Sequence, residues 1–146
     1  MERPADTSAD IQPSGWAAIY VRISEDRAGA GLGTARQEAD CRPLCLRRGY
    51  PDARIRVYED NDVSAYRGKR RPAYTRLLTD IAAGEVSLLT AWHTDRLHRS
   101  MIELEAFIEV IEAARIDLET AQSGKVDLST PAGRMVARQL AAVARY

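Results

Sequence analysis

The chain has 146 residues, enough for one domain with a substantial hydrophobic core but short for two. Its 21 basic and 21 acidic residues balance, so net charge gives no indication of a nucleic-acid partner, and only local clusters of charge can. No apolar run is long enough to cross a membrane and no secretory segment is evident, which favours a cytoplasmic protein.

The first strand is expected in the stretch of residues 16–24, after a polar arm, residues 1–15, that we expect to be disordered. Alternate positions of the strand form an aliphatic face, whereas the opposite face ends in Arg22. Ser24 follows where the hydrophobic run stops. Because sites of α/β proteins lie at the carboxyl ends of sheet strands, Arg22 and Ser24 are the first candidate site residues.

A loop and a helix follow. Residues 25–33 hold three glycines at alternate positions, too far from the strand for a dinucleotide-binding turn, so we interpret them as a flexible loop. Thr34 is expected to cap a helix that runs to about Arg48 and ends at Gly49. Pro43 inside this helix conflicts with it, since proline removes a backbone hydrogen bond.

Cys41 and Cys45 are the only cysteines, and their i, i+4 spacing suits neither a CxxC redox motif nor a four-ligand zinc site. We expect two buried, reduced thiols.

The rest of the chain continues to alternate strands with helices. Strands are expected over residues 54–59, 86–92 and 115–119, and helices from Pro72 to Gly84, after the Ser100–Glu103 capping box, and after Thr130. This alternation predicts an α/β domain with a largely parallel sheet. After Gly133 the last helix has no glycine or proline up to Tyr146 that would end it, and it has few polar positions, so we expect the chain to be a fragment and this helix to bind a partner.

Four arginines are candidates to converge at the carboxyl edge of such a sheet: Arg22, Arg71, Arg96 and Arg99. Guanidinium groups are planar donors that match phosphate oxygens and stay charged at any working pH. Asp95 beside them could orient an arginine or carry a proton. A serine among several arginines is a plausible nucleophile toward a phosphodiester, because the arginines would stabilise the charge of the transition state.

These residues resemble the catalytic domain of serine site-specific recombinases over residues 16–146. The motifs that carry the resemblance are Tyr20-Val21-Arg22-Ile23-Ser24, Arg36-Gln37 with Cys41, Ser64, Arg71-Pro72, Asp95-Arg96-Leu97-His98-Arg99-Ser100 and Ser129-Thr130-Pro131-Ala132-Gly133-Arg134-Met135. The segment from Asp95 to Glu105 is most similar to the large serine integrases of phages and other mobile elements.

The resemblance implies a three-layer, resolvase-like domain over residues 16–128 with four to five strands, and residues 129–146 as the start of a long, truncated interface helix. It implies that Ser24 attacks the scissile phosphate and becomes linked to the 5′ end of DNA, without metal or nucleotide. Roles in the site would fall to Arg22, Arg71, Arg96 and Arg99 as phosphate-binding groups, Asp95 as acid or orienting carboxylate, and Tyr20, Gln37 and Ser64 as supporting residues. The partners implied are DNA attachment sites and further copies of the chain, as a dimer and as a synaptic tetramer, in the cytoplasm of a bacterial host.

Two alternatives remain open. A metal-dependent nuclease could use Asp60, Asp62 and Asp95 as magnesium ligands, although Asp60 and Asp62 lie in a segment rich in turn formers. A non-catalytic dimerisation or regulatory module would use the last helix and leave the arginines on the surface.

Overall fold

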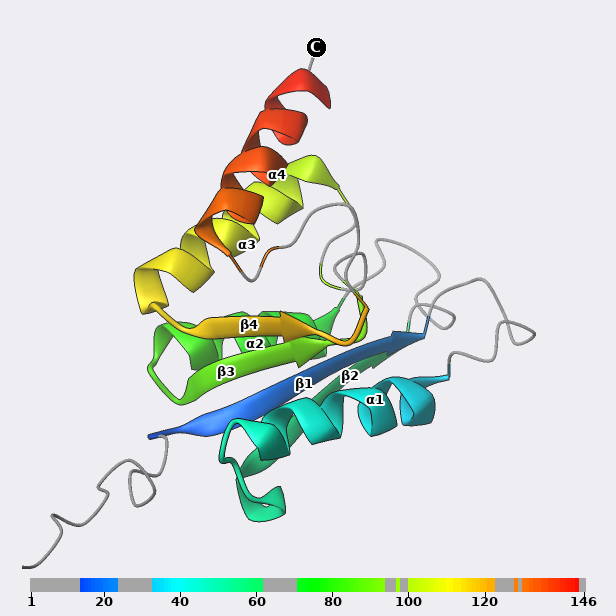
Figure 1. Ribbon diagram of the computed structural model, residues 1–146. Coiled ribbons are helices and arrows are strands. Elements are labelled where there is room, and N and C mark those ends of the chain that lie inside the picture. The colour runs from blue at the N-terminus through cyan, green and yellow to red at the C-terminus, as the bar shows by residue number, and fades with distance from the viewer. Residues whose placement is uncertain are drawn as a thin grey trace, which may run out of the picture.

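The computed structural model describes residues 14–23, 33–61, 71–93, 97, 100–122, 128 and 130–144. It contains one four-stranded, all-parallel sheet with the strand order β2-β1-β3-β4 (Figure 1). The strands are β1 (Trp16–Ile23), β2 (Ile55–Asn61), β3 (Val86–Ala91) and β4 (Asp117–Thr120). The predicted α/β fold with a parallel sheet is therefore confirmed.

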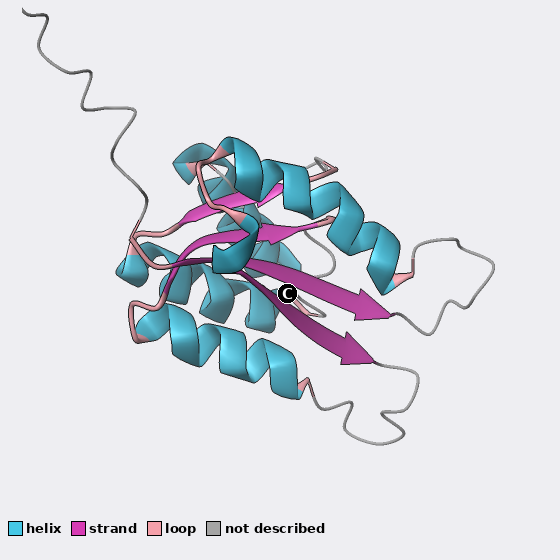
Figure 2. Ribbon diagram, turned by 90° about the horizontal axis from the view of Figure 1, so that it is seen from below, coloured by secondary structure: helices cyan, strands magenta, loops and turns pink. Residues whose placement is uncertain are grey.

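Helices cover both faces of the sheet (Figure 2). They are α1 (Thr34–Arg47), the short 3-10 helix η2 (Asp52–Arg54), α2 (Pro72–Ala82), α3 (Met101–Ala114) and α4 (Pro131–Ala144). Helix α1 lies on one face, α2 and α3 lie on the other, and α4 packs on the outer side of α3 (Figure 1).

Strand β1 is central, and its residues from Ala17 to Arg22 are all buried. Successive side chains of β1 point to opposite faces of the sheet. Ala18 and Tyr20 point into the core beneath α2 and α3, and the alternate residues of the strand point into the smaller core beneath α1. A parallel strand covered on both faces needs apolar side chains on both, which explains the nearly continuous hydrophobic run of β1.

The ends of several elements differ from the sequence-based expectation, among them β3, which ends at Ala91 and not at residue 92. Gly33, not Thr34, is the N-cap of α1, and Thr34 is its first helical residue. The second strand begins after η2 and runs on to Asn61, because it pairs with β1 up to Ile23. The fourth strand begins at Asp117, because Arg115 adopts a left-handed conformation with φ of 55° that ends α3.

Other expected features of the helices are confirmed. Pro72 is at the start of α2, the Ser100 hydroxyl accepts a hydrogen bond from the Glu103 N–H, and the Thr130 hydroxyl accepts one from the Gly133 N–H. Pro43 lies inside α1 without ending it. Helix α4 has 14 described residues, the same as α1 and α3, so the described residues do not show the long helix that was expected.

Both cysteines are buried and neither is in a disulfide, as expected. They lie in the core beneath α1, where Cys45 Sγ is 3.7 Å from Thr90 Oγ1. Burial raises the pKa of the Cys41 thiol to about 12, so it stays protonated and unreactive at neutral pH.

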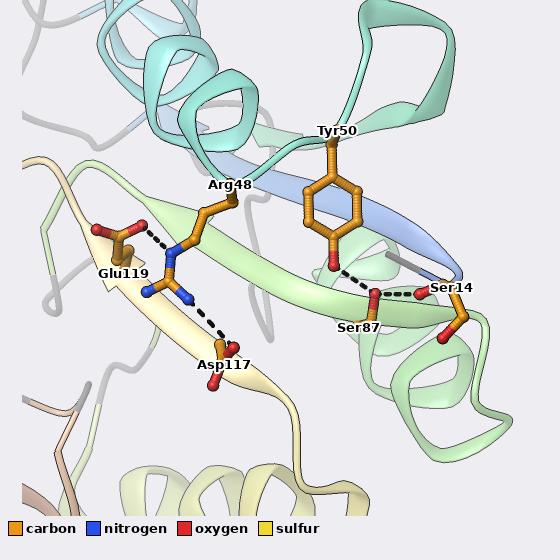
Figure 3. Close-up of polar contacts among 6 residues, drawn as sticks. All are labelled: Ser14, Arg48, Tyr50, Ser87, Asp117 and Glu119. Carbon is orange, nitrogen blue, oxygen red and sulfur yellow. Dashed lines mark hydrogen bonds and ion pairs between the residues drawn. The ribbon is translucent and has the colours of Figure 1, made fainter. Parts of the chain in front are cut away.

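The end of α1 is fastened to the sheet on the side away from the candidate site (Figure 3). Arg48 donates to Glu119 at 2.9 Å and to Asp117 at 3.1 Å, and thereby joins α1 to the edge strand β4. Tyr50 Oη lies 2.6 Å from Ser87 Oγ, which donates in turn to the Ser14 carbonyl near the start of β1. No helix among the described residues is long and apolar enough to cross a membrane.

The carboxylate of Asp60, at the end of β2, fixes the start of α2. Its oxygens accept hydrogen bonds from the N–H groups of Ala73 and Tyr74, both at 2.9 Å, and from the Tyr20 hydroxyl at 2.7 Å. Asp60 is only 3% exposed. A carboxylate that accepts from the first free N–H groups of a helix satisfies them and also interacts favourably with the helix dipole.

We predict that Asp60→Asn lowers the free energy of unfolding by about 3 kcal/mol, because an amide keeps one acceptor and places an N–H₂ group against donors. Urea denaturation measures the loss. The control is Asp117→Asn on β4, whose side chain is 71% exposed in its ion pair with Arg48, and which should cost less than about 1 kcal/mol. Equal, small losses in both variants would contradict the assignment.

Candidate active site

The candidate site lies at the carboxyl edge of the sheet, where β1 and β2 end side by side. Arg22 of β1 is paired in register with Asp60 of β2, and Arg71 immediately precedes α2. Because both strands are parallel, residues far apart in sequence reach the same edge.

Gln37 holds the end of β1 against α1. Its side-chain oxygen accepts from the Arg22 N–H at 3.2 Å, and its side-chain N–H₂ donates to the Arg22 carbonyl at 3.0 Å. Gln37 is completely buried. This pair of bonds satisfies both backbone groups of Arg22 and fixes the position of the next-to-last residue of β1.

Arg71 is an almost fully enclosed charge of the site, with a side chain that is 3% exposed. Its guanidinium lies over the ring of Tyr74, 3.9 Å from the ring centroid, in a cation–π contact. One terminal nitrogen forms an ion pair with Glu103, and the other lies 3.5 Å from the carbonyl oxygen of Leu97. Arg71 therefore links the start of α2 to the start of α3 and to the segment between β3 and α3.

Arg71 stays charged despite this burial. Burial alone would lower its pKa, but the interactions with Tyr20 and Glu103 outweigh it and raise the pKa above the usual arginine value.

Two tyrosines complete the buried wall of the site. The rings of Tyr20 and Tyr74 meet edge to face with centroids 5.6 Å apart. Burial and the hydrogen bond to Asp60 raise the pKa of Tyr20 far above the ordinary value, and burial together with the charge of Glu103 raises that of Tyr74 to about 12. Both phenols are therefore neutral at physiological pH and poor nucleophiles: the Tyr20 hydroxyl donates to Asp60, and the buried Tyr74 hydroxyl has no hydrogen-bond partner among the described residues.

Four residues predicted from the sequence are thus found around one edge: Tyr20, Arg22, Gln37 and Arg71. The other five, Ser24, Ser64, Asp95, Arg96 and Arg99, lie outside the described residues. Leu97, which lies between Arg96 and Arg99 in the sequence, is described and is completely buried in the core.

Sequence reasoning missed the parts that Asp60 and Glu103 have in this cluster. Asp60 was considered as a metal ligand or a turn residue, although its place at the end of a strand beside Arg22 could have identified it. Glu103 was assigned only to a helix cap, and nothing in the sequence relates it to Arg71, 32 residues earlier.

The described residues do not support a metal centre at the candidate site. No group of three or more histidine, cysteine, aspartate or glutamate residues among the described residues could hold a metal ion. Asp60 uses both carboxylate oxygens for hydrogen bonds to Tyr20 and α2, and Asp62 and Asp95 lie outside the described residues.

Comparison with known proteins identifies the domain. Residues 17–146 match the family described as Resolvase, N terminal domain. The Transposon Tn2501 resolvase of Escherichia coli is 30% identical over 91 residues, which cover 62% of this chain and 46% of that protein. The matched part thus spans about half the length of this curated relative.

Two solved structures share the fold. The N-terminal catalytic domain of TP901-1 integrase is 24% identical with a TM-score of 0.65, and the match covers 88% of this chain and 93% of that one. A resolvase family site-specific recombinase from Streptococcus pneumoniae is 19% identical with a TM-score of 0.70, covering 90% and 89%. The family match and the shared fold together show that this chain belongs to the resolvase N-terminal domain family, the catalytic domains of serine recombinases.

Proposed function

We propose that this domain cleaves and rejoins DNA through a covalent link to Ser24. The observation that carries the proposal is the convergence of Arg22 and Arg71 at the carboxyl edge of the sheet, next to the end of the strand that leads to Ser24. Two arginines whose backbone positions lie at one edge suit a phosphodiester, and neutral tyrosines leave the serine as the candidate nucleophile.

In the reaction, the Ser24 hydroxyl oxygen forms a bond to the scissile phosphorus as the bond to the 3′ oxygen breaks. The serine loses its proton and the departing 3′ oxygen gains one, with Asp95 as its candidate donor or as the carboxylate that orients an arginine. The product is a 5′-phosphoserine and a free 3′ hydroxyl. Rejoining is the reverse, and needs no energy source because the phosphoserine ester conserves the bond energy.

The arginines would act on the charge of the phosphate. Arg22, Arg71, Arg96 and Arg99 would bind its oxygens and stabilise the additional negative charge of the transition state. Gln37 would hold Arg22 through the backbone, and Tyr20 would support Arg71, with Ser64 as a further supporting residue.

The whole protein's substrate and partners follow from this proposal. We expect DNA attachment sites as substrate, dimers that assemble into a tetramer for strand exchange, a large-integrase type of protein, and action in the cytoplasm of a bacterial cell. The hydrogen bonds of Asp60 disfavour the magnesium nuclease, since a ligand already committed to a helix start is a poor metal donor.

Ser24→Ala should abolish formation of the covalent protein–DNA adduct while folding and DNA binding persist, because the variant removes only the attacking oxygen. The assay uses the protein that carries this domain and a nicked duplex containing its recombination site, with and without EDTA. Ser14→Ala, at an exposed serine just before β1, is the matched control and should form adduct normally. Adduct formation by the Ser24 variant would refute the nucleophile assignment, and strand cleavage without adduct that EDTA abolishes would favour the nuclease.

Helix α4 supports the proposed self-association. Ala137 is buried in the core with α3, and Arg138 forms an ion pair with Glu112 of α3 at 3.3 Å. On the same helix Met135 is 63% exposed and Val136 is 45% exposed. Adjacent exposed apolar side chains on a helix already packed along one side suit contact with a second copy.

Met135→Asp should therefore weaken self-association of the chain, because burial of a carboxylate in an apolar contact is unfavourable. Sedimentation velocity over a range of concentrations measures the effect. Thr75→Asp places the same charge at an exposed polar position of α2, away from α4, and should leave association unchanged. If both variants associate like the parent chain, or the parent chain stays monomeric at high concentration, α4 is not the interface.

A further inference from the structure

Arg71 is expected to bind phosphate, yet its guanidinium is almost fully enclosed in this structure. Its side chain is 3% exposed, one terminal nitrogen is paired with Glu103, the other faces the Leu97 carbonyl, and the flat side lies on Tyr74. A phosphate oxygen needs donors that are free to point at it. In the arrangement seen here, each terminal nitrogen of Arg71 already faces an acceptor of the protein.

The Glu103 carboxylate, which pairs with Arg71, resembles a phosphate in its charge and in its acceptor oxygens. A carboxylate and a phosphate both present negatively charged oxygens to the planar donor edge of a guanidinium, and they compete for it. The Glu103 side chain is 26% exposed, so this pair is open to solvent from the Glu103 side although Arg71 is not. An incoming anion can therefore reach the carboxylate side of the pair.

We propose that the Glu103 carboxylate occupies the place on Arg71 that a DNA phosphate takes, so that phosphate binds by displacing it. The inference rests on the proposed function, since it assumes that Arg71 contacts the substrate phosphate. It assigns Glu103 a positioning role. Without DNA the Glu103 carboxylate binds the Arg71 guanidinium and holds it at the site, and with DNA the phosphate replaces the carboxylate on the guanidinium.

The need for such a placeholder follows from the burial of Arg71. A buried, unpaired charge destabilises a fold strongly, and an arginine side chain cannot become neutral by losing its proton. Within the described residues, the Glu103 carboxylate is the negatively charged side chain in contact with the Arg71 guanidinium. Asp60 does not fill this role, because its oxygens are bound to Tyr20 and α2.

The capping role of Glu103 is separable from its contact with Arg71. The Ser100 hydroxyl accepts from the backbone N–H of Glu103, a bond that does not involve the Glu103 carboxylate. Glu103→Gln therefore leaves that capping bond in place and removes the charge that competes with phosphate.

The test is a titration of the 146-residue chain with inorganic phosphate, followed through the ¹⁵N NMR signals of the arginine side chains. Glu103→Gln should bind phosphate about tenfold more tightly at Arg71, the change that corresponds to loss of one competing charge-assisted hydrogen bond. Glu109→Gln, an exposed glutamate on the same helix, is the matched control and should bind as the parent chain does. Adding Arg71→Lys to Glu103→Gln should remove the gain, which assigns it to Arg71 rather than to another arginine.

A role of Glu103 in packing alone predicts the opposite sign. If Glu103→Gln keeps the circular dichroism spectrum of the parent chain and binds phosphate equally or more weakly, the proposal is wrong. If Glu103→Gln does not fold, Glu103→Asp serves as the test, because its shorter side chain keeps the charge but weakens the contact with Arg71. Tighter phosphate binding by Glu103→Asp supports the proposal, and unchanged or weaker binding overturns it. The titration involves no strand cleavage, so its outcome and that of Ser24→Ala test the two proposals separately.

Discussion

The hydrogen bonds of the Asp60 carboxylate determine where the rest of the candidate site lies. They join the end of β2, the side chain of Tyr20 in β1 and the first turn of α2 in a buried environment. Arg71 is the residue immediately before that turn, so its backbone position depends on the same bonds. The direction of α2 also puts Tyr74 under the Arg71 guanidinium. A displaced Asp60 would therefore move the guanidinium and its aromatic support together.

The two faces of the sheet have different chemical characters, and the difference explains how the domain accommodates charge. Beneath α1 the core is mainly aliphatic, with Tyr50, two neutral thiols and the Thr90 hydroxyl, which donates to the Ala18 carbonyl. Beneath α2 and α3 the core includes aromatic rings and borders on Asp60 and Arg71. Polarisable rings and hydrogen-bonded carboxylates stabilise a guanidinium in a way that aliphatic side chains cannot. The candidate site therefore lies on the face beneath α2 and α3.

Much of the fold could be predicted because its signals are local. The alternation in β1, the proline at the start of α2 and the caps at Ser100 and Thr130 each act within a few residues, and the structure has them as expected. The errors at element ends have the same origin: Gly33 caps α1 through its backbone, and Arg115 adopts a conformation that its residue type does not indicate. In the site, arginines could be identified by type and strand position. Their partners could not, since Asp60 and Glu103 meet Tyr20 and Arg71 across 40 and 32 residues of chain.

The ion pair between Arg71 and Glu103 bears on the equal numbers of acidic and basic residues in the chain. A surplus of basic residues is the usual indication of a nucleic-acid partner, and this chain has none. Yet the arginine of the site that the structure describes most fully is positioned by a carboxylate that neutralises it. A protein that must hold a buried guanidinium before its anionic substrate arrives needs a negative charge of its own beside it. Equal numbers of acidic and basic residues are then compatible with phosphate chemistry, because each enclosed arginine of such a site requires a counter-charge in the same chain.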